Sequence, residues 1–294
     1  METINIVITG AQGQLGQELQ FLSGNYPPQW KFVFLSRKEC DITDKRQISK
    51  MFEHYKPDYL INAAAYTLVD KAETDQEQAF AVNAYAMHNL VRHSHLTKII
   101  HISSDYIYHP VQYQQPIPED LFPQPRNVYA RSKWEGEKVL FSSDSSFIIL
   151  RTSWLYSVFG HNFVKTILKK LKAGEELRVV DDQTGSPTNA RDLAKVILQI
   201  ISEDKEGSYP VSVWCKAYNY ANEGATTWYG LALKIAALKG IKSNIQPIPT
   251  ALYPTPAERP PWSVMDLKKF TNTFSINVPH WEVSLNEALS EIVN

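Results

Sequence analysis

The chain has 294 residues, a net charge of −1 from 30 basic and 31 acidic side chains, and two cysteines. This length predicts one large or two modest domains with a sizeable core. The charge is balanced and no basic cluster occurs, so we expect no nucleic-acid partner. Cys40 and Cys215 lie outside any metal-ligand spacing, which argues against a zinc site or a disulfide framework.

No apolar run approaches the ~18 residues that span a bilayer, and the first ten residues lack the basic region of a signal peptide. Together with the two distant cysteines, this pattern predicts a cytoplasmic protein without a membrane partner.

Short runs rich in β-branched residues alternate with amphipathic runs in the first half of the chain, a pattern typical of β-α units around a parallel sheet. Between the third and fourth strands, residues 75–94 carry apolar side chains at helical spacing and predict a helix. The fold class is therefore α/β, with a Rossmann-type doubly wound parallel sheet. The expected strands cover residues 4–9, 32–35, 58–62, 98–103 and 146–151.

The alternation loosens after residue 151. Residues 177–180 and 189–201 continue the β-α pattern, whereas 209–214 and 226–240 indicate a separate lobe. Prolines gather between 247 and 261, which predicts a long irregular segment.

We expect two parts on this basis. Residues 1–155 would form the dinucleotide-binding Rossmann domain, to which residues 177–202 return. Residues 156–294 would mainly form a smaller C-terminal substrate-binding lobe.

A glycine-rich turn, "TGAQGQLGQEL", follows the first strand. Gly10, Gly13 and Gly16 have the spacing of a dinucleotide-binding turn, where a Cβ would block the tight bend, the approach to the pyrophosphate or the packing of helix on sheet. With 12 glycines in the chain, this triple spacing arises by chance roughly 0.02 times. The turn therefore predicts a nicotinamide dinucleotide cofactor.

The residues after the second strand indicate which cofactor binds. Ser36 and Arg37 stand where an acidic residue would hold the ribose hydroxyls of NAD. The guanidinium of Arg37 suits the extra phosphate of NADP, so we expect NADPH, with NADH as the alternative. Asp41 and Ile42 would hold the adenine. The small residues of "INAAAY" (61–66) would let backbone lie against the flat cofactor.

Tyr129 and Lys133 lie four residues apart in "NVYARSKWEGEKVL", on one face of an expected helix. Chance alone predicts roughly one such pair, so the context matters: the preceding strand ends in "ISSDY" and delivers Ser104 to the same sheet edge. Tyr129 would protonate the carbonyl oxygen during reduction of a ketone, and Ser104 would orient that carbonyl. An ammonium at ~4 Å would lower the phenol pKa by about 3 units, which is the role expected of Lys133.

The chain resembles the dTDP-4-dehydrorhamnose reductase family of extended short-chain dehydrogenases/reductases over nearly its full length. The matching motifs, beyond those above, are "NAAAYTLVDKAE", "RTSWLYSVFGHNFVKT", "DDQTGSPT" and "YPTPAERP". The resemblance implies NAD(P)H-dependent reduction of the 4-keto group of a nucleotide sugar, dTDP-4-dehydro-β-L-rhamnose, with Tyr129 as proton donor. The resemblance also allows a homodimer. Some members bind magnesium at a dimer contact, but Arg191 stands where a glutamate would be needed beside Glu18, so we expect no metal.

The resemblance also implies the remaining site residues. Trp154 matches a substrate-contacting tryptophan, and Arg259 is our candidate for the substrate phosphates because guanidinium suits them. By position in the motifs, the pyrophosphate meets Gly13, Gln14 and Leu15, the cofactor is lined by Asp41, Ile42, Ala64, Ala65 and Tyr66, and the sugar meets Ser104 and Asp105.

Two other interpretations stay open. A nucleotide-sugar dehydratase or epimerase has the same fold, but a dehydratase needs an acidic pair after the strand-end hydroxyl, and here Asp105 is followed by Tyr106. A non-catalytic regulatory subunit resembling the beta subunit of methionine adenosyltransferase shares many motifs, but retention of Ser104, Tyr129 and Lys133 would then be unexplained.

Overall fold

A six-stranded parallel sheet forms the centre of the computed structural model, which describes residues 3–109 and 114–292. The strand order β10-β5-β4-β3-β1-β2 reverses direction at β1, as in a doubly wound sheet, so the predicted fold class is confirmed. The five strands predicted in the first half all form, each within two residues of its expected bounds. The strands are β1 Ile4–Thr9, β2 Trp30–Leu35, β3 Tyr59–Asn62, β4 Lys98–Ser104, β5 Phe147–Thr152 and β10 Lys216–Asn219.

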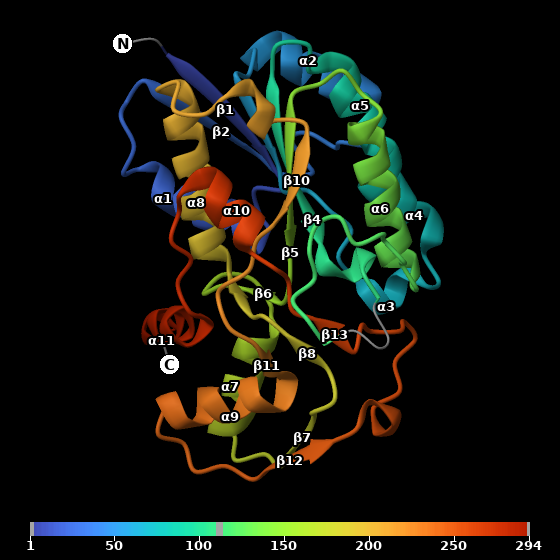
Figure 1. The fold of residues 1–294 in the computed structure, drawn as a ribbon, viewed down its shortest axis with the longest axis vertical. Helices are drawn as coiled ribbons and strands as arrows, with labels where there is room; N and C mark the ends of the chain where they lie inside the picture. The colour runs from blue at the N-terminus through green and yellow to red at the C-terminus, as the bar shows by residue number, and fades with distance from the viewer. Residues whose placement is uncertain (1–2, 110–113, 293–294) are drawn as a thin grey trace.

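Helices cover both faces of this sheet (Figure 1). The strands are apolar on both sides, as a sheet covered twice requires, and two apolar clusters lie on its two faces. One face is covered by α1 Gln14–Ser23, α8 Ala190–Lys205 and α10 Lys268–Phe274, and the other by α2 Lys45–Tyr55, α5 Ala86–His93 and α6 Val128–Phe141.

A smaller lobe lies below the sheet in Figure 1 and has its own apolar cluster. Its strands form small sheets separate from the six-stranded one. Its helices and its longer strands are α7 Phe163–Lys172, α9 Trp228–Leu238, α11 Trp281–Glu291, β7 Leu177–Val180 and β12 Ile245–Ile248. Its two-residue strands are β6 Leu155–Tyr156, β8 Thr184–Gly185, β9 Thr188–Asn189, β11 Thr226–Thr227 and β13 Trp262–Ser263.

The division between the two parts differs from the expectation in three segments, one of which is α10, which packs on the large sheet although it lies within residues 156–294. Residues 177–202 do not return as a unit: β7 pairs with β12 in the small lobe, and only α8 packs against α1. Residues 209–214 lead into β10, which pairs with β5, so they pack with the large sheet rather than the small lobe. A short apolar run has the same periodicity whichever sheet it joins, so the pattern alone did not reveal the partner.

The helix predicted over residues 75–94 is interrupted. It consists of α4 Gln76–Phe80, a π-helical turn at Ala81–Tyr85, and α5. In the turn, the buried Asn83 side chain accepts from the backbone N–H of Tyr66 (2.8 Å) and donates to Ser132 Oγ on α6 (2.9 Å). The π turn therefore ties the loop after β3 to α6, the helix predicted to carry the catalytic pair.

Within residues 3–109 and 114–292, no helix is both long and apolar enough to cross a bilayer.

Candidate active site

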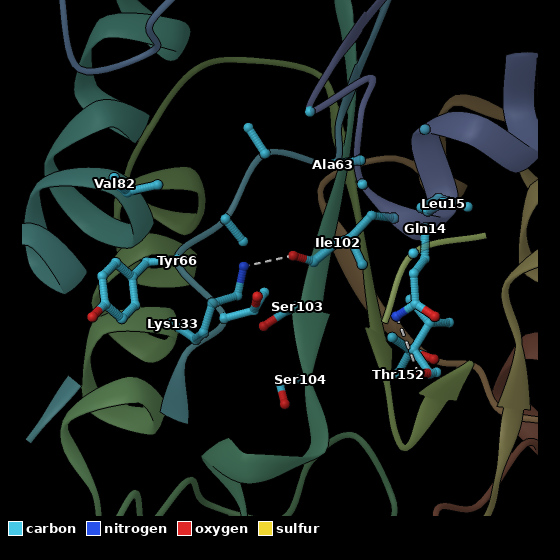
Figure 2. A pocket seen from close by; sticks show the side chains of 18 of the residues that line it. Gln14, Leu15, Ala63, Tyr66, Val82, Ile102, Ser103, Ser104, Lys133 and Thr152 are labelled. Carbon is cyan, nitrogen blue, oxygen red and sulfur yellow. Dashed lines mark hydrogen bonds between the residues drawn. The ribbon is translucent and has the colours of Figure 1, made fainter. Parts of the chain in front are cut away.

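A cavity of about 700 Å³ opens at the carboxyl ends of the strands, where doubly wound sheets bind nucleotides. Figure 2 shows Gln14 and Leu15 on one wall, Lys133 and Tyr66 on the opposite wall, and Ser104 between them. Every residue that we predicted for the site lines this cavity, with Arg259 as the one exception.

The glycine turn has the conformation that a dinucleotide-binding turn needs. Gly10 has a φ of +72°, and a Cβ there would lie 2.6 Å from the backbone of Ala63 at the end of β3. A Cβ on Gly16 would lie 2.5 Å from the carbonyl oxygen of Gly10. Gly13 is the residue before α1, so the free N–H groups of the helix N-terminus are available to an anion at this end of the cavity.

The adenine end of the predicted cofactor site is more open. The Arg37 side chain is 70% exposed, and its Nε lies 3.1 Å from Asp41 Oδ2. Ile42 and Cys40 line the cavity beside them. Burial, followed by the charges of Asp41 and Asp44, raises the pKa of the Cys40 thiol to about 11, which keeps it protonated and unreactive.

Ala64, Ala65 and Tyr66 follow β3 and line the cavity. The backbone at Ala63 and Ala64 approaches Gly10 closely. The small side chains of the two alanines therefore leave the space beside the glycine turn open to a ligand. The phenol of Tyr66 donates to Asp75 Oδ2 (3.1 Å), which fixes its ring at the edge of the site.

The predicted catalytic pair lies at the start of α6. Asn127 caps this helix by accepting from the N–H of Ala130 (2.7 Å), so that Tyr129 and Lys133 occupy successive turns of one face. Lys133 is 2% exposed, and its Nζ donates to the carbonyl of Ile102 in β4 (2.7 Å; Figure 2). The strand end, the helix and the glycine turn thus meet in one cavity.

Burial dominates the electrostatics of this pair. It raises the pKa of Tyr129 to about 12, although a hydrogen bond with Ser104 lowers it in part and the charge of Asp105 raises it further. Burial also lowers the pKa of Lys133 to about 8, against the charge of Glu137. The phenol pKa thus shifts in the direction opposite to the one expected, because burial penalises the phenolate more than its surroundings stabilise it. Tyr129 is therefore fully protonated at neutral pH.

Several polar atoms of the cavity wall have no partner among the described residues. They are Ser103 Oγ, Thr152 Oγ1 and Asp105 Oδ2, all buried. The other oxygen of Asp105 accepts from Ser104 Oγ (3.0 Å). Burial raises the pKa of Asp105 to about 7, while hydrogen bonds from Ser104 and Ser263 lower it in part. Unpaired buried groups of this kind fit a polar ligand that completes their hydrogen bonds.

Trp154 lies at the entrance to the small lobe, with a φ of +44°. Its indole is stacked on that of Trp228, with ring centroids 3.5 Å apart and planes at 8°. One face of Trp154 is thus covered by protein, and a sugar could use only the remaining face or the edge. A Cβ on Gly185 would lie 2.6 Å from this indole, so the glycine makes room for the ring.

Arg259 is the predicted site residue that the structure does not place at the cavity. Its Nη2 lies 2.6 Å from Oδ2 of Asp70, which belongs to the short helix α3 Val69–Ala72, and its Nη1 donates to the carbonyl of Ala257 (2.6 Å). The guanidinium fork suits a carboxylate as well as a phosphate, and here it holds the proline-rich segment against α3.

Sequence reasoning missed four residues that shape the site. Asn83 and Asn127 fix the elements around Tyr129, Trp228 supports Trp154, and His101 lies beneath Lys133. A polar residue within a predicted apolar run could have marked Asn83 and His101, whereas nothing local distinguished the other two.

This fold and cavity define a Rossmann-fold oxidoreductase of the short-chain dehydrogenase/reductase class. A buried tyrosine and lysine at helical spacing face the end of β4 beside a dinucleotide-type turn, which is the arrangement that hydride transfer to a carbonyl requires.

Comparisons with known proteins identify the family within this class. The family model of the RmlD substrate binding domain matches residues 4–294. The dTDP-4-dehydrorhamnose reductase of Aggregatibacter actinomycetemcomitans is 36% identical over 95% of this chain and 96% of the relative. The spore coat polysaccharide biosynthesis protein SpsK of Bacillus subtilis (strain 168) is 34% identical over 97% of both chains.

A solved structure agrees with these matches. The dTDP-4-dehydrorhamnose reductase of Bacillus anthracis, crystallised in complex with NADP, superposes with a TM-score of 0.89 and 32% identity, covering 99% of this chain and 100% of that one. The chain therefore belongs to the dTDP-4-dehydrorhamnose reductase family, which confirms the resemblance found in its sequence.

Glu18 and Arg191 occupy the positions that the resemblance links with magnesium, and they contact each other. Glu18 is buried, with Oε2 2.8 Å from Arg191 Nε and Oε1 accepting from Ser157 Oγ (2.6 Å). Both carboxylate oxygens are thus engaged within the chain. The expected absence of a metal stays a prediction.

Proposed function

We propose that this protein uses NADPH to reduce the 4-keto group of dTDP-4-dehydro-β-L-rhamnose to the hydroxyl of dTDP-β-L-rhamnose. The observation that carries the proposal is the meeting of Tyr129, Lys133 and Ser104 in one cavity beside the glycine turn. The family and the NADP complex of the B. anthracis relative support the substrate class and the cofactor.

NADPH would supply a hydride to C4 of the sugar. Negative charge then develops on the carbonyl oxygen, and Tyr129 is the proton donor in reach of the end of β4. With its pKa near 12 the phenol keeps its proton until a stronger base, the alkoxide, forms beside it. Ser104 orients the carbonyl, and the ammonium of Lys133 stabilises the phenolate left by proton transfer.

The cofactor fits the residues of the cavity. The N-terminus of α1, with Gly13, Gln14 and Leu15, would meet the pyrophosphate, and Arg37 the 2′-phosphate. On the substrate side, the unpaired oxygen of Asp105 would accept a sugar hydroxyl. We place the rest of the nucleotide sugar against Trp154 and the small lobe.

Two further points belong to the proposal. The free thiols of Cys40 and Cys215 support a reducing, cytoplasmic setting. A homodimer follows from the resemblance alone, and light scattering of the purified protein tests it.

The test of the proposed function is a turnover assay with a panel of 4-keto nucleotide sugars. The purified protein is mixed with NADPH or NADH, loss of the reduced cofactor is followed by absorbance, and the product is identified by NMR. We expect dTDP-4-dehydrorhamnose to give the highest kcat/KM, and NADPH to exceed NADH. Faster reduction of another keto sugar would reassign the substrate, and no oxidation of cofactor with any member would favour the regulatory-subunit alternative.

A further inference from the structure

A buried chain of polar side chains runs beneath Lys133, across paired positions of three neighbouring strands. Thr9 on β1 donates its hydroxyl hydrogen to Asn62 Oδ1 on β3 (2.7 Å). Asn62 Nδ2 lies 3.0 Å from His101 Nδ1 on β4, and His101 Nε2 lies 3.4 Å from Lys133 Nζ. All four side chains are almost fully buried.

The contacts of Asn62 determine the position of the imidazole proton. Its oxygen faces the hydroxyl of Thr9, and its amide nitrogen faces two acceptors, His101 Nδ1 and the sulfur of Met87 (3.3 Å). With the Asn62 amide in this orientation, His101 Nδ1 accepts a hydrogen bond and carries no proton. Burial, and then the charge of Lys133, holds the pKa of His101 well below its usual range, so the ring is neutral. A neutral ring with a bare Nδ1 has its hydrogen on Nε2.

This hydrogen points at Lys133. An ammonium has only donors, so it cannot accept from His101 Nε2–H, whereas a neutral amine can. The carbonyl of Ile102 can accept a hydrogen bond from Lys133 Nζ whether Lys133 is charged or neutral (2.7 Å). The imidazole thus favours the neutral form of Lys133, and it does so through a hydrogen bond rather than through a charge.

Besides His101 on β4, the titratable groups around Lys133 are on α6 and at Asp105, the residue after β4. On α6, Tyr129 is uncharged at neutral pH, and Glu137 favours the ammonium. Glu137 is itself held by Arg151 Nη2 on β5 (2.7 Å), which reduces its influence. After β4, Asp105 lies in the same cavity. The two groups recorded within hydrogen-bond distance of Lys133 Nζ in the described part of the chain are His101 Nε2 and the carbonyl of Ile102, so His101 is the recorded neighbour that can donate to the amine.

We propose that His101, held in one tautomer by Asn62 and Thr9, is a positioning residue that sets the protonation state of Lys133 and thereby the upper pH limit of reduction. The inference rests on the proposed function, because it deepens the role of Lys133 there. Lys133 therefore loses its proton at a lower pH than it would if a hydrogen-bond acceptor stood in the place of His101 Nε2–H. The phenolate of Tyr129 then loses the ammonium that stabilises it.

The tautomer is measured directly on the full-length, ¹⁵N-labelled protein by long-range ¹H–¹⁵N NMR of the histidine rings at pH 7. The signals of His101 are assigned by their loss in His101→Gln. We expect a neutral ring with its proton on Nε2. A charged ring, or a proton on Nδ1, overturns the proposal. This measurement needs no substrate, so its outcome is separate from that of the substrate panel.

The consequence for catalysis is measured as the pH profile of kcat with saturating NADPH and keto sugar. His101→Gln places an amide near the Nε2 position, where its oxygen can accept from the ammonium. His101→Asn reaches only the Nδ1 position and is the matched control. The alkaline limb of His101→Gln should lie about 1 to 2 pH units above that of His101→Asn, the size of one hydrogen bond to a charged group. A His101→Gln limb that does not lie above the control overturns the proposal.

Discussion

Replacing Lys133 by Met should stabilise the protein while it removes activity. Lys133 is 2% exposed, and burial lowers its pKa from the usual 10.5 to about 8. One pH unit corresponds to about 1.36 kcal/mol, so holding the ammonium in this cavity costs about 3 kcal/mol at pH 7. The carbonyl of Ile102 would lose its partner, at a cost of about 1 kcal/mol. The free energy of unfolding should therefore rise by about 2 kcal/mol, since Met fills a similar volume.

The gain should depend on pH in a defined direction. The folded protein releases the Lys133 proton near pH 8, whereas the unfolded chain keeps it until about pH 10.5. Between these values the unfolded state binds more protons, so the wild-type protein becomes more stable as pH rises through this window. The advantage of Lys133→Met is therefore complete below pH 8 and disappears toward pH 10.5.

Urea unfolding of the wild type and Lys133→Met at pH 7 and at about pH 10 measures both effects. Lys50→Met, an exposed position on α2, controls for the change of residue type. Lower stability of Lys133→Met than of wild type at pH 7 would refute the reasoning. An equal advantage at both pH values would refute the assignment of the cost to the buried charge.

Three further predictions concern the cofactor turn and the proline-rich segment. Arg37→Ala should weaken NADPH binding about tenfold and leave NADH nearly unchanged, since only NADPH offers a phosphate; equal losses in fluorescence titrations would show that Arg37 does not contact it. Gly10→Ala should abolish cofactor binding, because its Cβ would lie 2.6 Å from the backbone of Ala63; near-normal NADPH affinity would contradict the tight approach. In a double-mutant cycle of unfolding, Arg259→Ala and Asp70→Ala should show a coupling of about 1 kcal/mol, reduced by the partial exposure of the pair, whereas additive effects would mean that the ion pair is not maintained.

The parts of the site that could be predicted depend on local geometry. Gly10, Gly13 and Gly16 are required by backbone conformation and close approach, and Tyr129 and Lys133 share a face through helical spacing alone. Residues at the ends of parallel strands share one sheet edge, which brought Ser104 to the same cavity.

The parts that could not be predicted depend on partners distant in sequence. Arg259 finds Asp70 189 residues away, and no local pattern marks that pairing. The strand β7 finds β12 rather than the large sheet. The phenol of Tyr129 was expected to be acidified by Lys133, but the depth of its burial, which only the packed structure reveals, raises its pKa instead.

The role of Tyr129 as the acid is tested most directly by comparing Tyr129→Phe with the wild type, with the exposed Tyr85→Phe as control. The kcat for dTDP-4-dehydrorhamnose and the Kd for NADPH are measured for each protein. Tyr129→Phe should lose about 100-fold or more in kcat while its Kd stays within about threefold, because only the proton donor is removed. A kcat within about threefold of the wild type would contradict the account.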